Sequence, residues 1–387
     1  MTRPSPNLQN AMNASFQIGV PTREGGRTGQ LQLAHGEIET PTFMPVGTYG
    51  TVRGLAPREL EEAGTQILLA NAYHLALRPG AETISNLGGL HRFMGWDRPI
   101  LTDSGGYQLF SLAEHVKINE DGAVLRSPID GTKTQLTPES VVAIELALGV
   151  DVGMVFDALE ADGTDRDRMA RAADRTLRWA RRARTASEKA GAAAEGTAFF
   201  AIMQGGLFED LRRANADALA ELDFPGYAVG GLSVGEDHGE TMRVGQASAA
   251  MLPVHKPRYM MGMGTPIDLV WLAGWGYDLF DCVIPTRNAR NGHLFTRDGV
   301  INIRNASHKL STAPVEEGCD CYCCGRFGRG YLHHLAKRGE MLVASMASLH
   351  NVTFYQRLMG DIRAALAADD YERFRGEFLA RYNGDTA

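Results

Sequence analysis

The chain has 387 residues, a formal net charge of -7, 44% hydrophobic residues and 22% charged residues. At roughly 150 residues per domain, this length allows two or three domains, or one large barrel with insertions. The composition is too apolar for a disordered chain, and no apolar run approaches the roughly 20 residues that a membrane-spanning helix needs. The acidic balance excludes nucleic-acid binding by bulk positive charge, but not an enzyme with a local basic surface. The start of the chain lacks the apolar core of a secretory signal, so we expect a cytoplasmic protein with reduced thiols.

One pattern recurs along the chain: a short apolar run rich in β-branched residues, then Gly or Pro, then a helical periodicity. The runs begin near Thr42, Gln66, Pro99, Asp151, Phe199, Tyr227, Arg258 and Leu279. Strands that are apolar throughout are typical of parallel sheets covered by crossover helices. Eight such units predict an α/β fold of the (β/α)8 TIM-barrel type. An open doubly wound sheet is the alternative.

Two segments interrupt this pattern. Residues 107–137 contain VLRSPIDGTKTQL, which predicts a hairpin around an Asp-Gly pair, inserted after the third strand. Residues 291–350 follow the eighth strand and carry four of the five cysteines, so we expect a zinc-binding subdomain there. We therefore expect a catalytic barrel over residues 1–290, the subdomain over 291–350, and C-terminal helices over 351–387 that complete the barrel.

Polar, glycine-rich strings end most of the predicted strands, among them TDSGG, FDAL, MQGG and DCVIPTR. In a barrel these ends converge on the C-terminal face, where active sites are built. Asp103, Asp157 and Asp281 lie at or near such ends, so we expect their carboxylates to face one cavity. Paired carboxylates favour glycosidic chemistry, in which one attacks the anomeric carbon and the other transfers a proton. The alternative for any one of these aspartates is a turn or helix-cap residue.

Four of the five cysteines lie within six residues, at Cys319, Cys321, Cys323 and Cys324. In a reducing compartment such a cluster indicates metal ligands and not disulfides. The spacing C-x-C-x2-C lets three thiolates face one Zn2+ ion, which takes about four N or S ligands in a tetrahedron. Three or more sulfur ligands leave no open position for water, which indicates a structural site. The candidates for the fourth ligand, which spacing alone does not separate, are Cys323, His333, His334 and His350.

The segment around the cysteines is basic although the whole chain is acidic. Between Arg287 and Glu340 there are nine Lys or Arg residues and five acids. A basic element beside the mouth of a barrel is a candidate reader of a phosphate backbone. The alternative is an ordinary solvated face.

Several longer strings carry a resemblance to a known family: ILLANAYHLALRPG, PILTDSGGYQLFSL, AIMQGG, GGLSVGE, LFDCVIPTRNARNG, and CDCYCC followed by YLHHL and LHN. In this order they resemble the bacterial tRNA-guanine transglycosylases, the queuine tRNA-ribosyltransferase family. The resemblance covers nearly the whole chain, and the combination of TDSGGYQ, DCVIPTR and CxCxxC is specific.

The resemblance implies an enzyme that exchanges the wobble guanine (position 34) of G-U-N anticodon tRNAs, those for Asp, Asn, His and Tyr. The incoming base is a 7-deazaguanine, in bacteria usually the 7-aminomethyl precursor of queuine. By the same resemblance, Asp281 attacks the ribose C1′ to form a covalent intermediate, and Asp103 is the general acid and base. The residues that the resemblance assigns to the base are Asp157, Gln204 and the Gly231 amide for its edge, the Leu232 carbonyl for the aminomethyl group, and Tyr107 and Met261 as a sandwich.

The resemblance also implies partners and a metal. Arg287 and Arg290 contact the tRNA, and the enzyme acts as a homodimer. One structural Zn2+ per subunit is held by Cys319, Cys321, Cys324 and His350. Cys323, where relatives usually have Thr, is then not a ligand.

The chain departs from the family pattern beside the base. It reads FDAL where relatives usually read FDEC, so Ala158 and Leu159 change the pocket wall next to Asp157. Val234 matches the bacterial pattern and favours the aminomethyl base, whereas relatives that take the larger queuine tend to have Gly there. A queuine-accepting member and a non-catalytic RNA-binding partner subunit are the alternatives, and the presence of both Asp103 and Asp281 argues against the second.

Overall fold

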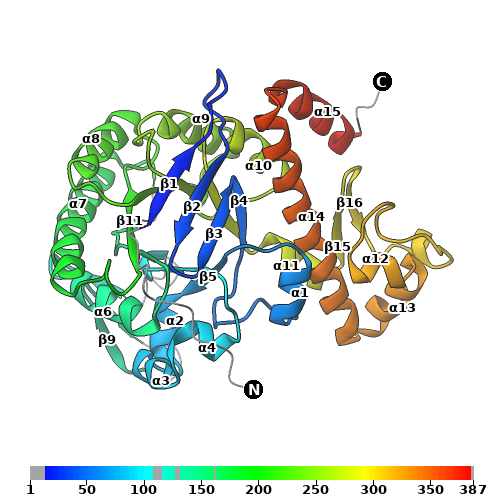
Figure 1. Cartoon of the computed structure of the whole chain (residues 1–387), viewed down its shortest axis with the longest axis horizontal. Coiled ribbons are helices and arrows are strands. Elements are labelled where there is room, and N and C mark those ends of the chain that lie inside the picture. The colour runs from blue at the N-terminus through cyan, green and yellow to red at the C-terminus, as the bar shows by residue number, and fades with distance from the viewer. Residues whose placement is uncertain (1–13, 108–115, 127–130, 161–162, 385–387) are drawn as a thin grey trace.

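The computed structural model describes residues 14–384 except 108–115, 127–130 and 161–162. Eight parallel strands form one sheet in the order β4-β14-β13-β12-β11-β10-β6-β5, and a parallel bridge from Val46 to Leu69 joins its two edges. The sheet is thus a (β/α)8 barrel (Figure 1), which confirms the predicted fold and excludes the open doubly wound sheet. Its strands are β4 (Thr42–Pro45), β5 (Leu68–Asn71), β6 (Ile100–Asp103), β10 (Val152–Met154), β11 (Ala198–Met203), β12 (Gly226–Val229), β13 (Arg258–Met260) and β14 (Leu279–Cys282).

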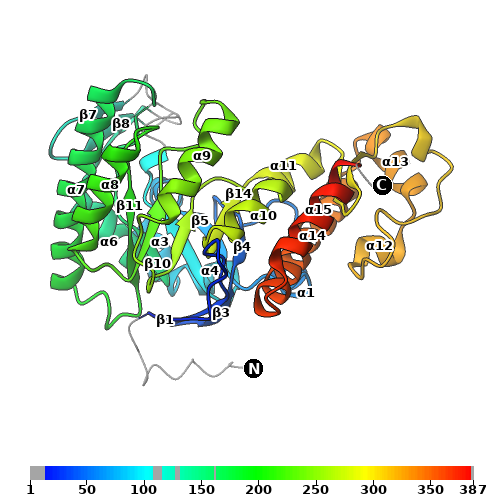
Figure 2. The same ribbon diagram turned by 90° about the horizontal axis from the view of Figure 1, so that it is seen from above.

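Helices follow the strands and surround the barrel (Figures 1 and 2). They are α1 (Pro57–Glu62), α2 (Ala72–Leu77), α3 (Ala81–Asn86), α4 (Gly89–Met94), α6 (Pro138–Leu148), α7 (Arg166–Lys189), α8 (Glu209–Ala220), α9 (His238–Ala249), α10 (Pro266–Gly274) and α11 (Ile284–Arg290). The strand β11 shows why its sequence, AFFAIM, is wholly apolar: all six residues are buried, and both α7 and α8 contact the strand. Burial of each large side chain of this kind stabilises the fold by about 1.5–3 kcal/mol.

Two small antiparallel sheets lie at opposite ends of the barrel (Figure 2). The first consists of β1 (Ser15–Ile18), β2 (Gly29–Leu33) and β3 (Gly36–Thr40), and its apolar side chains join the main core and close the N-terminal end. The second follows β6 and consists of β7 (Val116–Ile118), β8 (Ala123–Arg126) and β9 (Lys133–Leu136). β8 and β9 pair on either side of the Asp-Gly pair at which a hairpin was expected, although residues 127–130 lie outside the described residues.

A separate group of elements projects from one side of the barrel (Figure 1). It consists of β15 (His293–Thr296), β16 (Gly299–Asn302), the 3-10 helix η3 (Ala306–His308), α12 (Tyr322–Arg326) and α13 (Arg329–Arg338). The long helix α14 (Met341–Ala367) runs without a break across residue 350, where we placed a boundary, and α15 (Tyr371–Asn383) follows it. α14 packs on both α12 and β4, and its Gln356 Nε2 donates to Phe43 O at 3.0 Å. No helix in the described part of the chain is long and apolar enough to cross a membrane.

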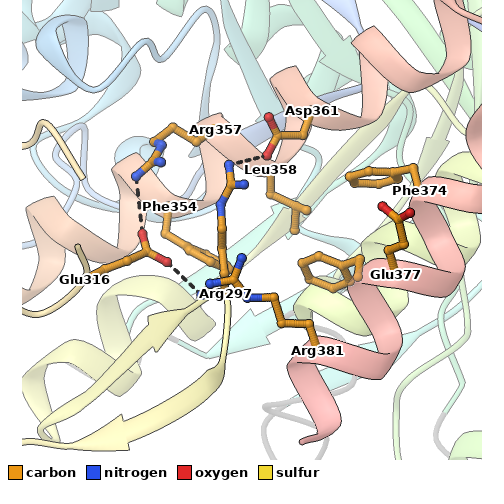
Figure 3. A pocket seen from close by; sticks show the side chains of 10 residues that line it. Arg297, Glu316, Phe354, Arg357, Leu358, Asp361, Phe374, Glu377 and Arg381 are labelled. Carbon is orange, nitrogen blue, oxygen red and sulfur yellow. Dashed lines mark hydrogen bonds and ion pairs between the residues drawn. The ribbon is translucent and has the colours of Figure 1, made fainter. Parts of the chain in front are cut away.

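A cavity of about 180 Å³ lies between the projecting group and the two C-terminal helices (Figure 3). Its volume is below the ~300 Å³ at which small-molecule sites begin. Arg297 pairs with Asp361 at 2.7 Å and Arg357 with Glu316 at 3.2 Å, so the guanidinium groups that line it already have carboxylate partners. We therefore interpret the cavity as a packing gap in the interface between the projecting group and the C-terminal helices, and not as a ligand site.

A buried carboxylate ties three elements together at the N-terminal end of the barrel. Asp151 Oδ1 accepts from His35 N at 2.9 Å and lies 3.0 Å from His35 Nδ1, while its Oδ2 accepts from Ile100 N and lies 2.9 Å from His91 Nε2. The two imidazole rings stack with their centroids 3.6 Å apart. Burial lowers the pKa of His35, but the hydrogen bond and charge of Asp151, with a smaller effect of Asp97, outweigh burial and raise it.

This raised pKa predicts a pH dependence of stability. A histidine with a higher pKa in the folded state stabilises the fold below its unfolded pKa of about 6.5, and the contribution is lost as the pH rises through the folded value. We therefore expect the melting temperature of the wild type to fall more between pH 6 and pH 8 than that of His35→Gln. Calorimetric melting of both proteins at the two pH values measures the difference. An identical pH dependence in the two proteins would contradict this assignment.

Candidate active site

Three aspartates from the ends of barrel strands act on one another at the C-terminal mouth. Asp103 is the last residue of β6, Asp281 lies in β14, and Asp157 follows β10. Asp157 and Asp281 are buried, and Asp103 is half-buried. Burial, followed by the negative charges of Asp281 and Asp157, raises the pKa of Asp103 well above its usual range. The structure thus brings together the three carboxylates that the sequence placed at strand ends.

The carboxylate of Asp281 is held through one oxygen. Its Oδ1 accepts from the Tyr259 hydroxyl at 2.6 Å and from Gly262 N at 2.7 Å. Burial raises the pKa of Asp281, and these two donors oppose the shift. Within the described residues no hydrogen bond falls on Oδ2, so this oxygen is free to contact a ligand. The sequence did not reveal Tyr259, because a tyrosine inside an apolar strand is indistinguishable from a core residue.

The environments of Asp103 and Asp281 differ in a chemically useful way. Asp103 is beside two other carboxylates, which favours its protonated form, whereas Asp281 has two donors that favour its ionised form. A hydrogen bond from Asn71, its partner in register on β5, partly offsets the shift at Asp103. When the surroundings of two carboxyl groups favour opposite protonation states, the pair supplies an acid and an anion at the same pH.

The third carboxylate, Asp157, is paired with the side-chain amide of Gln204. Gln204 Nε2 donates to Asp157 Oδ2 at 2.6 Å, and the backbone N of Gln204 donates to Asn215 Oδ1 at 3.0 Å. Burial raises the pKa of Asp157 to about 6, and the hydrogen bond from Gln204 partly offsets it. A Cβ at Gly106 would lie 1.9 Å from Asp157 Oδ1, so the TDSGG string must end in glycine for Asp157 to occupy this place.

The loop after β12 lies against Gln204, the residue that bonds to Asp157. Gly231 has φ +66°, and a Cβ there would lie 2.3 Å from Gln204 Oε1 and 3.7 Å from Leu159 Cδ1. Glu236 accepts from the amides of Ser233 and Val234. Because N–H and C=O of a trans peptide point in opposite directions, the carbonyl of the buried Leu232 is turned away from Glu236.

Tyr107 and Met261 lie just beyond β6 and β13, on the same face as the aspartates. Tyr107 is 54% exposed and Met261 is half-buried. An exposed aromatic ring at a site mouth is suited to stacking on a base. That the two side chains enclose a base stays a prediction.

Arginines without acidic partners flank the mouth. Arg287 and Arg290 lie on α11, directly after β14, and Arg287 is exposed. Burial, followed by the positive charges of Arg53 and Arg287, lowers the pKa of Arg290. No ion pair with an acid involves these three side chains where the structure describes the chain. Such a concentration of positive charge is suited to a phosphodiester backbone. Arg53, from the loop after β4, was not predicted.

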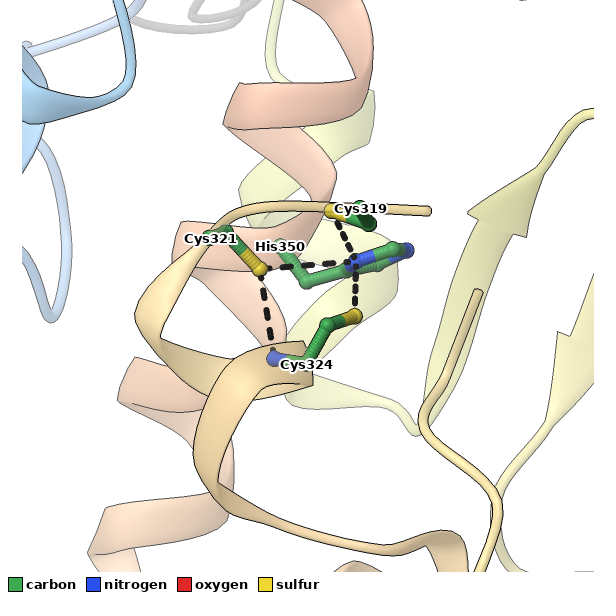
Figure 4. A group of neighbouring side chains, drawn as sticks. All are labelled: Cys319, Cys321, Cys324 and His350. Carbon is green, nitrogen blue, oxygen red and sulfur yellow. Dashed lines mark hydrogen bonds between the residues drawn. The ribbon is translucent and has the colours of Figure 1, made fainter. Parts of the chain in front are cut away.

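Three cysteines and one histidine converge in the projecting group (Figure 4). Cys319, Cys321 and Cys324 lie 3.7, 3.8 and 3.3 Å from His350 Nδ1, measured from each Sγ. The four donor atoms lie within 4.8 Å of one another. His350 comes from α14, and its Nε2 lies 2.7 Å from Phe295 O, a contact that leaves Nδ1 as the electron-pair donor.

This donor set fits a tetrahedral metal ion. With Zn–S near 2.3 Å and Zn–N near 2.0 Å, tetrahedral ligands place N and S about 3.5 Å apart, which is close to the three distances observed. Cys323 is buried outside this group. The cluster can therefore hold a metal ion through the four residues that the family resemblance indicated.

Comparison with known proteins agrees with this geometry. The family model described as queuine tRNA-ribosyltransferase matches residues 22–384. The queuine tRNA-ribosyltransferase of Thiobacillus denitrificans is 51% identical over 372 residues, which are 95% of this chain and 97% of that protein. The chain belongs to the queuine tRNA-ribosyltransferase family. The relatives of the same name from Zymomonas mobilis and Neisseria gonorrhoeae are each 48% identical, over 95% and 91% of this chain and 95% and 94% of theirs.

The queuine tRNA-ribosyltransferases are pentosyltransferases, enzymes that transfer a pentosyl group. The match covers the barrel, the projecting group and both C-terminal helices. The sequence did reveal the aspartates and the cysteines, because those residue types stand out at strand ends and in clusters. It did not reveal Tyr259, Gly262 or Asn71, which bond to the aspartates and have no distinctive spacing.

The four-residue cluster makes a prediction about zinc. Cys324→Ala removes one thiolate, so the zinc content is expected to fall from about one per chain to below about 0.2, and the protein is expected to melt at a lower temperature. Cys323→Ala is the matched control, since it removes a buried neighbouring thiol and is expected to retain zinc. Elemental analysis of dialysed protein measures both. Full zinc content in the Cys324 variant, or loss of zinc in the Cys323 variant, would contradict the ligand set.

Proposed function

We propose that the protein exchanges the wobble guanine of tRNAs with G-U-N anticodons for 7-aminomethyl-7-deazaguanine. The observation that carries this proposal is the pair of carboxyl groups at the barrel mouth: Asp103 with a strongly raised pKa, and Asp281 held by two donors on Oδ1. One supplies a proton and the other an anion, which is the combination that glycosidic exchange requires. Family membership supports the choice of tRNA as the substrate.

In the proposed reaction Asp281 Oδ2 attacks the ribose C1′ of the nucleotide. The C1′–N9 bond breaks, an ester to Asp281 forms, and Asp103 gives its proton to the departing guanine. Asp103 then takes the N9 proton of the incoming base, whose nitrogen attacks C1′ and releases the Asp281 carboxylate. Two inversions retain the configuration at C1′. Because the ester conserves the energy of the glycosidic bond, no nucleotide cofactor is required.

The proposed base contacts use the polar groups beside the two carboxylates. The Asp157 carboxylate accepts from the N1–H and amino groups of guanine. Gln204 and the Gly231 amide form hydrogen bonds to the remaining polar atoms on the edge of the base. The Leu232 carbonyl, which is turned away from Glu236, accepts from the aminomethyl group of the incoming base, and Tyr107 and Met261 enclose the faces of that base. The close packing of Gln204 on Asp157 and Gly231 supports this assignment.

The proposed partner is the anticodon loop of tRNA, whose phosphates lie on Arg287 and Arg290. A base in a single-stranded loop leaves its stack at low cost, which suits a site recessed in a barrel mouth. The metal is a structural Zn2+ on Cys319, Cys321, Cys324 and His350. The protein acts in the cytoplasm as a homodimer, as the resemblance implied.

The role of Asp281 is tested by Asp281→Asn. The amide is isosteric and still accepts from Tyr259 and Gly262, so the fold is expected to remain intact, but the neutral group does not attack C1′. Incorporation of labelled guanine into tRNA(Tyr) is expected to fall by at least about 1,000-fold, a loss of the order seen for essential catalytic groups. The covalent tRNA adduct is expected to disappear from denaturing gels while tRNA binding persists. An adduct that forms in this variant would refute the nucleophile, and a wild type without incorporation would favour the non-catalytic partner subunit.

Base preference is tested by competition of guanine, 7-aminomethyl-7-deazaguanine and queuine for one unmodified tRNA. Val234 follows Leu232 by two residues, and a valine at this position is the bacterial pattern that favours the aminomethyl base. We expect incorporation of the aminomethyl base to exceed that of queuine by at least about tenfold in kcat/KM. Val234→Gly is expected to narrow this ratio. Queuine incorporation as efficient as that of the aminomethyl base would establish the queuine-accepting alternative.

A further inference from the structure

Arg212 on α8 is completely buried behind the base pocket. Its Nε donates to Gly206 O at 2.7 Å, and its Nη2 donates to Gly230 O at 3.0 Å and reaches Gly231 O at 3.4 Å. One guanidinium thus joins the loop after β11, which begins with Gln204, to the loop after β12, which contains Gly231.

The charge of Arg212 has no paired acid. Among the described residues no carboxylate lies within ion-pair distance, and its Nη1 is buried without a hydrogen-bond partner. Burial lowers the pKa of Arg212 to about 10, and the charges of Tyr277 and Glu236 only partly oppose this effect. Burial of a charge without an acidic partner is costly, and the hydrogen bonds to backbone carbonyls offset only part of that cost. These carbonyls belong to two neighbouring loops, so the guanidinium fixes the position of one loop against the other.

The N–H groups of the peptide units that Arg212 binds face the base pocket. The Gly230 carbonyl belongs to the same peptide unit as the Gly231 N–H, and the Gly231 carbonyl to the same unit as the Leu232 N–H. Because the C=O and N–H of a trans peptide are antiparallel, binding both carbonyls turns both N–H groups away from Arg212. Two consecutive N–H groups pointing one way form a small site for an oxygen with partial negative charge.

The contacts of the glycines place that site beside the base-reading pair. A Cβ at Gly230 would lie 2.7 Å from Gln204 Nε2, and one at Gly231 would lie 2.3 Å from Gln204 Oε1. On the other loop, a Cβ at Gly205 would lie 2.8 Å from Arg212 Cγ. The backbone therefore passes between the guanidinium and the Gln204 amide with no room for a side chain.

We propose that Arg212 is a positioning residue for base recognition. Through two carbonyls it aims the Gly231 and Leu232 N–H groups at the carbonyl oxygen (O6) of guanine or of a 7-deazaguanine, and its positive charge increases the polarisation of these donors. Arg212 itself does not contact the base. The inference rests on the proposed function, since it assigns a specificity role within the same site.

The test replaces Arg212 by Met and by Lys, and measures the KM for guanine at saturating tRNA and the KM for tRNA at saturating guanine. Arg212→Met keeps most of the volume and removes the donors, so the KM for guanine is expected to rise about 10- to 100-fold. The KM for tRNA is expected to stay within about twofold of the wild type, while the melting temperature falls by a few degrees because Met leaves the Gly206 and Gly230 carbonyls without their donor. Arg212→Lys keeps the charge but not the planar fork, so an intermediate KM for guanine is expected.

Arg213→Met is the matched control, because Arg213 is the next residue on α8 and is exposed. It is expected to leave both KM values unchanged. An unchanged KM for guanine in the Met and Lys variants would overturn the proposal, as would a parallel rise in both KM values with a lower melting temperature, which indicates a general structural role. If the Met variant does not fold, the KM of the Lys variant for guanine tests the proposal alone. A wild type that incorporates no guanine would overturn the proposed function itself, whereas the outcomes above concern Arg212 alone.

Discussion

The crowding of three aspartates at one end of a closed barrel is the constraint on which the rest of the site depends. Carboxylates buried beside one another do not all ionise, so their neighbours decide which one holds a proton. Tyr259 and Gly262 favour the anion at Asp281, and Gln204 bonds to Asp157, while Asp103 has the largest upward shift. The division of roles among chemically identical side chains thus arises from a few hydrogen bonds.

The region around these aspartates is built by backbone that approaches very closely. Gly106 approaches Asp157, and Gly230 and Gly231 lie against Gln204, at distances that no other residue type allows. Arg212 and Asn215, one turn apart on α8, bond to these loops from behind. The groups proposed to read the base are therefore held by a second layer of contacts, and preorganisation of this kind lowers the entropic cost of recognition.

The helix α14 links the metal cluster to the barrel. His350 belongs to the cluster, and the next residue, Asn351, bonds to Phe295 N, Pro285 O and His293 O. Pro285 is on α11, the helix that bears Arg287 and Arg290. A metal ion in the cluster would thus hold α14 in a position that also orients the basic helix beside the mouth. This connection gives a physical reason for a structural metal far from the reacting bond.

The sequence by itself determined the barrel and the chemical groups of the site. Eight apolar runs became the eight strands, because strands buried on both faces leave an unambiguous apolar signature, and aspartates at their ends had to meet at one mouth. The cysteine spacing indicated a metal site but left the fourth ligand open, and His350 was indicated only by family resemblance. Only the tertiary structure decided which contacts distinguish the aspartates and what Arg212 binds, since Tyr259, Asn71 and Arg212 act through residues distant in sequence. Such pairings depend on which strands and loops become neighbours in the barrel, and local sequence patterns do not record them.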